Sequence, residues 1–398
     1  MCTTLFDMNY KYLTPEMLKG FDNYKYSAID SSPISRYLMH PFWNNVVLLC
    51  PRWMAPNLLT FLGFLFTLSA ALLLSYYDWN FYGDSIPPWV FLVVPVLIFV
   101  GYTLDGIDGK QARNTGTSSP LGELFDHGLD SWTAALIPVC LYSVFGRYDV
   151  TQTNSTRNVF VSPQGEFSVP PYRFYFVIWN VFLTFYITHW EKYITGTLFL
   201  PWGYDLSMLS TTAVFFFMYF TDQSLWAYKV TENLHLGSMV ETIFYLTSIV
   251  PSLPVCVLNI RKSYIEKTGK NLAFKEAIRP LAPLATFAFV TILWATVSPN
   301  NIILAHPRAF YFLTGNVFSN ITCRLVVSQM SGTRCRTTNA LILPVLAGLI
   351  LSYYLPFLEV TCVYLLLALT TWAHLHYGIC VVDQMCDHLR IRCFKIDP

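Results

Sequence analysis

The decisive stretch is 88–130, where PWVFLVVPVLIFVGYTL (88–104) runs directly into DGIDGKQARNTGTSSPLGELFDHGLD (105–130). The first part is apolar, as expected of a helix inside a membrane. The second part carries four aspartates, and a further apolar run follows it as far as Phe145. Charged side chains beside a membrane helix are energetically costly, so carboxylates in such a place are candidates for function.

The composition of the whole chain points the same way. Of its 398 residues, 54% are hydrophobic and only 12% are charged, whereas a soluble domain carries about 25% charged residues. The net charge of +1 offers no basic surface for nucleic acid. These values exclude an ordinary soluble enzyme, a disordered chain and a nucleic-acid binder. We predict an all-α polytopic integral membrane protein.

About ten stretches approach the roughly 20 apolar residues that cross a bilayer. They are Met54–Tyr76, Pro88–Leu104, Leu121–Phe145, Tyr172–Thr188, Leu206–Phe220, Leu236–Ile260, Leu281–Val297, Ala309–Gln329, Leu341–Leu355 and Leu358–Val382. We therefore expect about ten transmembrane helices. The predicted parts are an interfacial, cytosolic N-terminal segment (1–53), a core of about six spans with the aspartates (54–260), C-terminal membrane helices (261–383) and a cytosolic tail (384–398).

Positive charge predicts the orientation. With ten spans, 20 of the 25 Lys and Arg residues fall on the side of the N-terminus, which the positive-inside rule assigns to the cytosol. The aspartates then face the cytosol. The sequon Asn154-Ser155-Thr156 falls in the loop 146–171, which this topology places in the lumen, where asparagine can be glycosylated.

Helical spacing predicts that the aspartates converge. Asp105 and Asp108 share a helix face if the second span continues that far, and Asp126 and Asp130 share a face of the next helix. A polar turn at 111–120 lets the two helices run antiparallel. Four converging carboxylates repel one another unless cations intervene. Two divalent ions would balance them, and hard oxygen ligands select Mg²⁺ or Mn²⁺.

A carboxylate-bound metal pair suits phosphoryl transfer. Small residues beside the aspartates would let a nucleotide approach the backbone, and Arg113 can bind a phosphate through two hydrogen bonds. His127 lies four residues after Glu123, which could orient its imidazole as a general base. Two other interpretations stay open on spacing alone: a proton or cation pathway of a transporter, and a solvated loop with chance acidic residues. The histidine favours an enzyme that deprotonates a hydroxyl.

Other polar residues are weaker candidates for a functional role. Asn57 and Thr60 begin the first span and either contact a nucleotide or cap the helix. Lys192 either binds phosphate or is a cation at the membrane interface. His374 and His376 in the last span are expected to be hydrogen-bonded packing groups.

The motif resembles the signature of the CDP-alcohol phosphotransferases, D-G-x(2)-A-R-x(8)-G-x(3)-D-x(3)-D. The matching positions are Asp108, Gly109, Ala112, Arg113, Gly122, Asp126 and Asp130, with Asp105 as the family's preceding aspartate. Further segments, including 39–44, 55–60, 189–193 and 201–205, are similar to the animal ethanolaminephosphotransferases of the selenoprotein I type.

This resemblance implies an activity and a partner set. Phosphoethanolamine would pass from CDP-ethanolamine to diacylglycerol, giving phosphatidylethanolamine and CMP, by attack of the diacylglycerol hydroxyl on the β-phosphate. The enzyme would lie in membrane lipid of the endoplasmic reticulum or Golgi, and dimers are common in the family. Choline specificity and dual specificity are the alternatives, with a cation-coupled transporter more remote.

The resemblance also implies roles for residues. The aspartates 105, 108, 126 and 130 would hold the Mg²⁺ or Mn²⁺ pair, and other branches of the family assign Asp130 as ligand or as base. His127 with Glu123 is similar to the proposed general-base pair. The CDP moiety would lie against Gly109, Ala112, Arg113 and Gly122.

Overall fold

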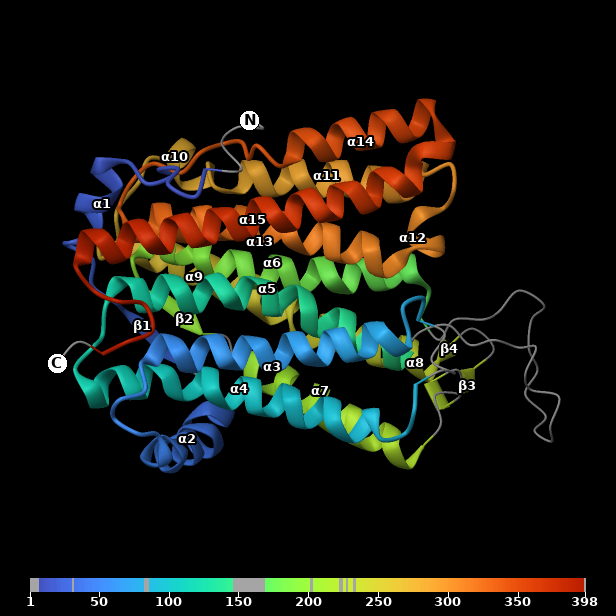
Figure 1. Ribbon diagram of the computed structural model, residues 1–398, viewed down its shortest axis with the longest axis horizontal. Coiled ribbons are helices and arrows are strands. Elements are labelled where there is room, and N and C mark those ends of the chain that lie inside the picture. The colour runs from blue at the N-terminus through green and yellow to red at the C-terminus, as the bar shows by residue number, and fades with distance from the viewer. Residues whose placement is uncertain are drawn as a thin grey trace.

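A computed structural model describes residues 7–30, 32–81, 86–145, 169–200, 203–221, 225–226, 228–231 and 234–396. The predicted sequon at Asn154 lies outside these residues. Long helices run side by side along one direction (Figure 1). They are α3 (Pro56–Tyr77), α4 (Val90–Thr115), α5 (Pro120–Phe145), α6 (Pro171–Thr195), α7 (Gly203–Phe220), α8 (Leu236–Thr247), α9 (Ile249–Glu266), α11 (Leu281–Val297), α13 (Pro307–Met330), α14 (Ile342–Tyr354) and α15 (Glu359–Leu389).

The short elements lie mostly at the two ends of this bundle. They are α1 (Pro15–Phe21), β1 (Ala28–Asp30), a π-helix (Ser35–Met39), α2 (His40–Val46), a 3₁₀ turn (Val47–Leu49), β2 (Leu198–Leu200), β3 (Lys229–Thr231), β4 (Leu234–His235), α10 (Phe274–Ile278), α12 (Ile302–Ala305) and a second 3₁₀ turn (Pro356–Leu358). The strands are too short to form more than two small pairs, β1 with β2 and β3 with β4.

The helices confirm a helical membrane protein. Within the described residues, five helical segments are long and apolar enough to span a bilayer: α3, α4, α5, the α8–α9 segment and 356–389, with α11 and α14 as shorter apolar helices. The α8–α9 segment is apolar although only 6% of its most apolar stretch is buried. A long apolar helix that is so little buried is stable in lipid, whereas exposing it to water would be unfavourable.

Each predicted stretch coincides with a helix, and the sixth coincides with α8 and α9, which meet at Ser248. The second helix is longer than its apolar stretch. Hydropathy ends at Leu104, whereas α4 continues to Thr115 and carries Asp105 and Asp108 into the polar region. It ends at Gly116, whose φ of 68° is the left-handed conformation that glycine accepts readily.

Two glycines set how closely the helices beside the aspartates approach. A Cβ on Gly63 of α3 would lie 2.9 Å from the Gly101 carbonyl oxygen of α4, and one on Gly101 would lie 2.8 Å from the Gly63 oxygen. Helix α3 packs against both α4 and α5, whereas α4 and α5 hardly touch each other. The two aspartate-bearing helices are therefore held by a common neighbour.

Helix α13 lies at the centre of the bundle, in contact with α5, α6 and α15. Its polar side chains find partners inside: Ser319 Oγ lies 2.5 Å from Ser131 Oγ of α5 and 2.7 Å from His374 Nε2 of α15. His376 Nδ1 lies 2.9 Å from the Tyr12 hydroxyl. Both histidines are thus hydrogen-bonded packing groups, as predicted.

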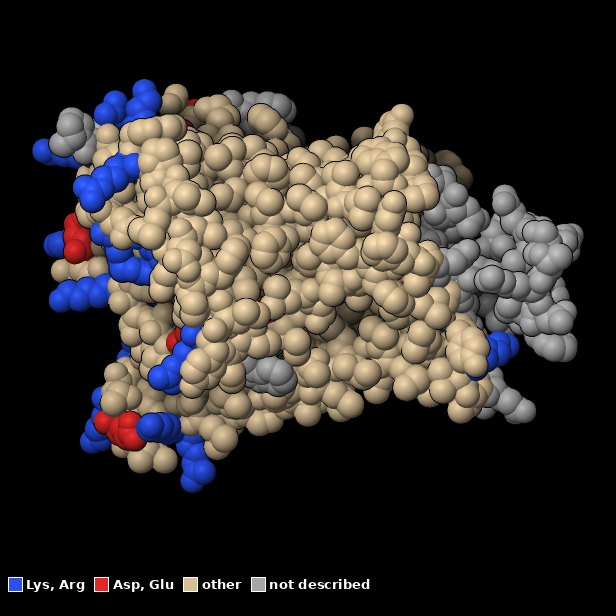
Figure 2. Space-filling model, turned by 90° about the horizontal axis from the view of Figure 1, so that it is seen from below, with Lys and Arg blue, Asp and Glu red and all other residues tan. Residues whose placement is uncertain are grey.

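The N-terminal segment covers one end of the bundle. Strand β1 pairs with β2 in parallel, and the hydroxyls of Ser32 and Ser35 donate to Asp205 of α7. Most Lys and Arg residues visible in Figure 2 gather at this end, where Figure 1 places α1, α2 and the C-terminus. On the face that Figure 2 shows, positive charge thus lies mostly at one end, in agreement with the predicted topology. The four-part division of the chain, the cytosolic orientation and the count of ten spans stay predictions.

Candidate active site

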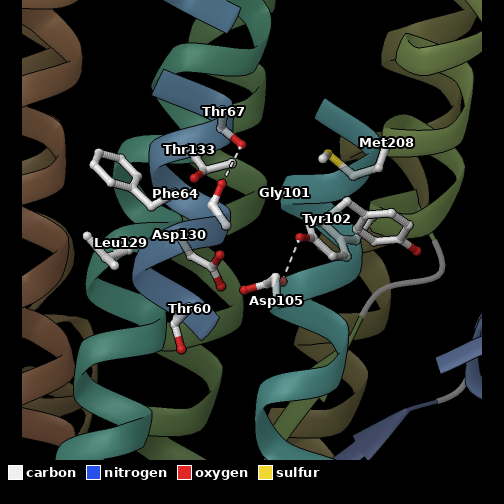
Figure 3. A pocket seen from close by; sticks show the side chains of 12 residues that line it. Thr60, Phe64, Thr67, Gly101, Tyr102, Asp105, Leu129, Asp130, Thr133 and Met208 are labelled. Carbon is white, nitrogen blue, oxygen red and sulfur yellow. Dashed lines mark hydrogen bonds between the residues drawn. The ribbon is translucent and has the colours of Figure 1, made fainter. Parts of the chain in front are cut away.

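Four aspartates from two helices converge at the covered end of the bundle. One carboxylate oxygen from each of Asp105, Asp108 and Asp126 lies within 4.8 Å of the other two, and the same holds for ligand atoms of Asp126, His127 and Asp130. Asp105 on α4 and Asp130 on α5 point toward each other across a cavity (Figure 3). The structure therefore brings together the carboxylates that helical spacing predicted to share faces.

Hydroxyl groups from two other helices hold these carboxylates. Thr60 Oγ1 of α3 donates to Asp108 Oδ2 at 2.6 Å, and the Tyr204 hydroxyl of α7 donates to Asp105 Oδ2 at 3.2 Å. Thr60 does not cap its helix, since α3 begins after Ala55. Its contact with Asp108 was not predicted, because 48 residues separate the two in the chain.

His127 lies between the aspartates on one side and Glu123 on the other. Its Nδ1 is 3.8 Å from Asp130 Oδ2 and 3.9 Å from Asp126 Oδ2, while its Nε2 is 3.7 Å from Glu123 Oε1. The predicted Glu123–His127 pair is thus adjacent, but it is longer than a hydrogen bond. The imidazole is buried. The His189 ring packs edge-on against it, with the two ring centroids 4.9 Å apart.

Glu123 is bound by two groups that spacing did not connect with it. The Lys192 ammonium of α6 donates to Glu123 Oε1, and the Tyr24 hydroxyl donates to the same oxygen at 2.7 Å. The Lys192 side chain is 1% exposed, and it also lies over the rings of Tyr24 and Tyr26. The alternative of a lysine at the membrane interface is therefore wrong: the N-terminal segment covers it.

Several buried polar atoms here have no hydrogen-bond partner within the described part of the chain. They are Glu123 Oε2, His127 Nε2, His189 Nδ1 and both amide atoms of Gln329. Buried polar atoms are normally paired with protein or water. These buried polar groups next to the aspartates are consequently suited to a polar ligand or to bound water.

Small residues leave space on the other side of the carboxylates. A Cβ on Gly109 would meet only Arg113 Nη1, at 3.7 Å, and one on Gly122 would meet Asn57 Oδ1 at 3.4 Å. Ala112 is half-buried in the same turn of α4. Asn57 does not cap α3; its amide donates to Cys393 Sγ at 3.7 Å. Among the described residues, side chains therefore make only ordinary contacts with a Cβ placed on either glycine.

A cavity of about 310 Å³ extends from Asp105 and Asp130 into the bundle. Phe64, Leu129 and Met208 give it apolar walls, as Figure 3 shows. One end of the cavity is acidic, and the rest combines these apolar side chains with threonine and tyrosine hydroxyls. It can therefore receive a hydroxyl attached to a partly apolar molecule.

The donor set fits a pair of divalent cations. Carboxylate oxygens of Asp105, Asp108 and Asp126 form one group, and ligand atoms of Asp126, His127 and Asp130 form a second that shares Asp126. Oxygen-rich sites of this kind suit Mg²⁺ or Mn²⁺. Converging carboxylates without a cation would repel one another. The residues present are therefore compatible with a divalent-metal centre.

The region that carries the aspartates matches a known protein family. The profile of the CDP-alcohol phosphatidyltransferase family matches residues 53–162, which include all four aspartates. The similarity to named relatives extends beyond this region to nearly the whole chain. The chain belongs to this family: it is a membrane-embedded transferase of phospholipid biosynthesis.

Named relatives narrow the class further. The chain is 42% identical to ethanolaminephosphotransferase 1 of Mus musculus, over 97% of this chain and 95% of the relative. It is 41% identical to ethanolaminephosphotransferase 1 of Homo sapiens over the same shares. Choline/ethanolaminephosphotransferase 1 of Arabidopsis thaliana is 27% identical over 97% of this chain and 98% of the relative.

Proposed function

We propose that this protein transfers phosphoethanolamine from CDP-ethanolamine to diacylglycerol, giving phosphatidylethanolamine and CMP. The observation that carries the proposal is 42% identity over 97% of the chain to an ethanolaminephosphotransferase. The converging carboxylates supply a centre suited to this chemistry. Because the chain belongs to a transferase family, its aspartates are explained without the transporter interpretation.

In this proposal Asp105, Asp108, Asp126 and Asp130 hold two divalent cations, Mg²⁺ or Mn²⁺. Bound there, the ions would neutralise the pyrophosphate and the departing CMP phosphate. Thr60 and Tyr204 fix the orientation of two of these carboxylates by donating hydrogen bonds to them.

The nucleotide lies on the side of Gly109, Ala112 and Gly122 in this proposal. A Cβ on either glycine would meet nothing closer than 3.4 Å among the described residues, which supports the approach of a ligand to the backbone there. Arg113 is exposed at the rim and can bind a phosphate oxygen pair through its guanidinium. Asn57 borders the same space from α3.

His127 acts as the general base. Its Nδ1 faces the aspartates, so this nitrogen is placed to take the proton of the diacylglycerol 3-hydroxyl. As that oxygen bonds to the β-phosphorus, the bond to the bridging oxygen breaks and CMP leaves. Glu123 faces Nε2, and a closure of about 0.7 Å would bring the pair from 3.7 Å into hydrogen-bond range. Lys192 and Tyr24 hold Glu123 in this position.

Diacylglycerol reaches Asp130 along the side of the cavity that Phe64, Leu129 and Met208 form, and its hydroxyl meets the acidic end. The active site faces the cytosol of the endoplasmic reticulum or Golgi, since one end of the bundle carries most of the positive charge. A homodimer is the assembly we expect.

The deciding experiment is a reconstituted assay of the purified protein with diacylglycerol, Mg²⁺ or Mn²⁺, and CDP-ethanolamine or CDP-choline. CMP and lipid product are both quantified, with a chelator control. We expect metal-dependent phosphatidylethanolamine and at least a hundredfold loss in Asp126→Asn. Asp387→Asn, an exposed aspartate on α15, is the matched control. Full activity of folded Asp126→Asn would refute the mechanism.

Dual headgroup specificity is the alternative with specific support, because plant relatives at 27% and 29% identity are named choline/ethanolaminephosphotransferases. Equal use of both donors in the same assay would establish it and leave the mechanism unchanged.

A further inference from the structure

A second, larger cavity lies away from the aspartates. It has a volume of about 520 Å³ and shares no lining residue with the cavity at Asp130. The N-terminal segment at Tyr12, helices α13 and α15, and the loop 331–341 enclose it.

Two arginines line this cavity without acidic partners. Within the described residues, no carboxylate lies within 4 Å of the guanidinium of Arg324 or Arg336. Arg324 stacks on Tyr377, with its guanidinium carbon 4.4 Å from the ring centroid, and its Nε donates to Asn320 Oδ1 at 3.1 Å. The neighbouring Arg334 differs, because its Nε and Nη2 both donate to the Glu276 carboxylate.

The other lining residues indicate what kind of anion fits. Thr338 and Ser328 add hydroxyl groups to the two guanidinium groups, which favour phosphate because their paired donors match its oxygens. Asn339 and the tyrosines 12 and 377 add further polar groups, and the apolar part of the wall includes Leu13, Met17, Pro283, Ile321 and Val327. A phosphate group, alone or at the end of a short apolar body, therefore matches the cavity.

The position of the cavity agrees with this chemistry. It lies where the N-terminal segment meets the C-terminal halves of α13 and α15, at the end of the bundle where Lys and Arg gather (Figure 2). Phosphate groups of lipids and of soluble metabolites both meet a membrane protein at such a boundary.

We propose that the cavity between Arg324 and Arg336 binds a phosphate-bearing anion, separately from the catalytic centre. The ligand is either a phospholipid headgroup or a free phosphate, and both would be held by the same two guanidinium groups. This goes beyond the proposed function, which uses neither arginine.

The test measures binding by calorimetry to the full-length protein in detergent. Three probes are compared: dihexanoyl phosphatidic acid, inorganic phosphate, and dihexanoylglycerol, which lacks phosphate. Saturating CMP and Mn²⁺ are present so that the proposed nucleotide site is occupied. Arg324→Gln and Arg336→Gln are the test variants. Arg334→Gln is the matched control, because it removes a charge from the same loop outside the cavity.

We expect at least tenfold weaker binding of a phosphate probe in each test variant, equivalent to about 1.4 kcal/mol, and less than twofold change in Arg334→Gln. Binding of phosphatidic acid alone assigns the site to lipid headgroups, and comparable binding of inorganic phosphate assigns it to free phosphate. Arg336 is exposed, so its variant tests the site even if Arg324→Gln misfolds. Failure of both phosphate probes to bind, or equal weakening in Arg334→Gln and Arg336→Gln, would overturn the proposal.

Discussion

Gly109→Ala should stabilise the protein and at the same time weaken nucleotide binding. The added methyl group would touch only Arg113 Nη1, at 3.7 Å, which is ordinary van der Waals contact. Replacing glycine by alanine inside a helix gains about 0.5–1 kcal/mol. If the nucleotide lies against this backbone, the methyl group occupies its space, and such overpacking costs about 1–3 kcal/mol.

The expected outcome is therefore a higher thermal midpoint together with a KM for CDP-ethanolamine raised by about 5- to 150-fold, at 1.4 kcal/mol per factor of ten. Gly378→Ala on α15 is the matched control, because a Cβ there meets nothing within 4 Å. It should give the same stabilisation with an unchanged KM. An unchanged KM in Gly109→Ala would refute the proposed nucleotide position, and a lowered midpoint would refute the open space.

Three further outcomes follow from the contacts. Lys192→Met leaves the Glu123 carboxylate buried without its cation, so the free energy of unfolding, measured by denaturant titration, should fall by about 3–5 kcal/mol; an unchanged value would mean that the pair is solvated. Gly106→Ala places a methyl group against the Trp43 ring, and a loss of about 1–3 kcal/mol in the same titration is expected; wild-type stability would show that Trp43 moves freely. Adding Mn²⁺ to chelator-stripped protein should raise the thermal midpoint, by the equivalent of about 2.7 kcal/mol at 100 times the Kd; no shift would count against a metal centre.

Local sequence patterns were sufficient for the helices. Apolar length located the long helices, with α8 and α9 joined in one stretch, and α11 has the predicted bounds of Leu281–Val297. Hydropathy underestimated α4 because it records only the part of a helix that suits lipid, whereas backbone hydrogen bonding continues into the polar region up to Gly116. The break at Ser248 between α8 and α9 left no mark in the apolar pattern.

The candidate site likewise has features that the sequence predicted and features that it did not. Periodicity predicted that Asp126 and Asp130 share one face, because residues four apart lie on the same side of a helix. It could not predict that Thr60 would donate to Asp108, since that contact depends on how closely α3 and α4 approach. Nor could it predict the arginine-lined cavity, whose walls come from the two ends of the chain.

The sequence by itself determined the helical membrane architecture and the aspartate faces, because both depend on interactions within about one helical turn and on the preference of apolar residues for lipid. Only the tertiary structure decided the environment of Lys192. A lysine at a helix end can extend to water or pair inside the protein, and nothing in its neighbours distinguishes the two. The covering N-terminal segment excludes water from it, and Glu123, 69 residues away in the chain, supplies the compensating charge.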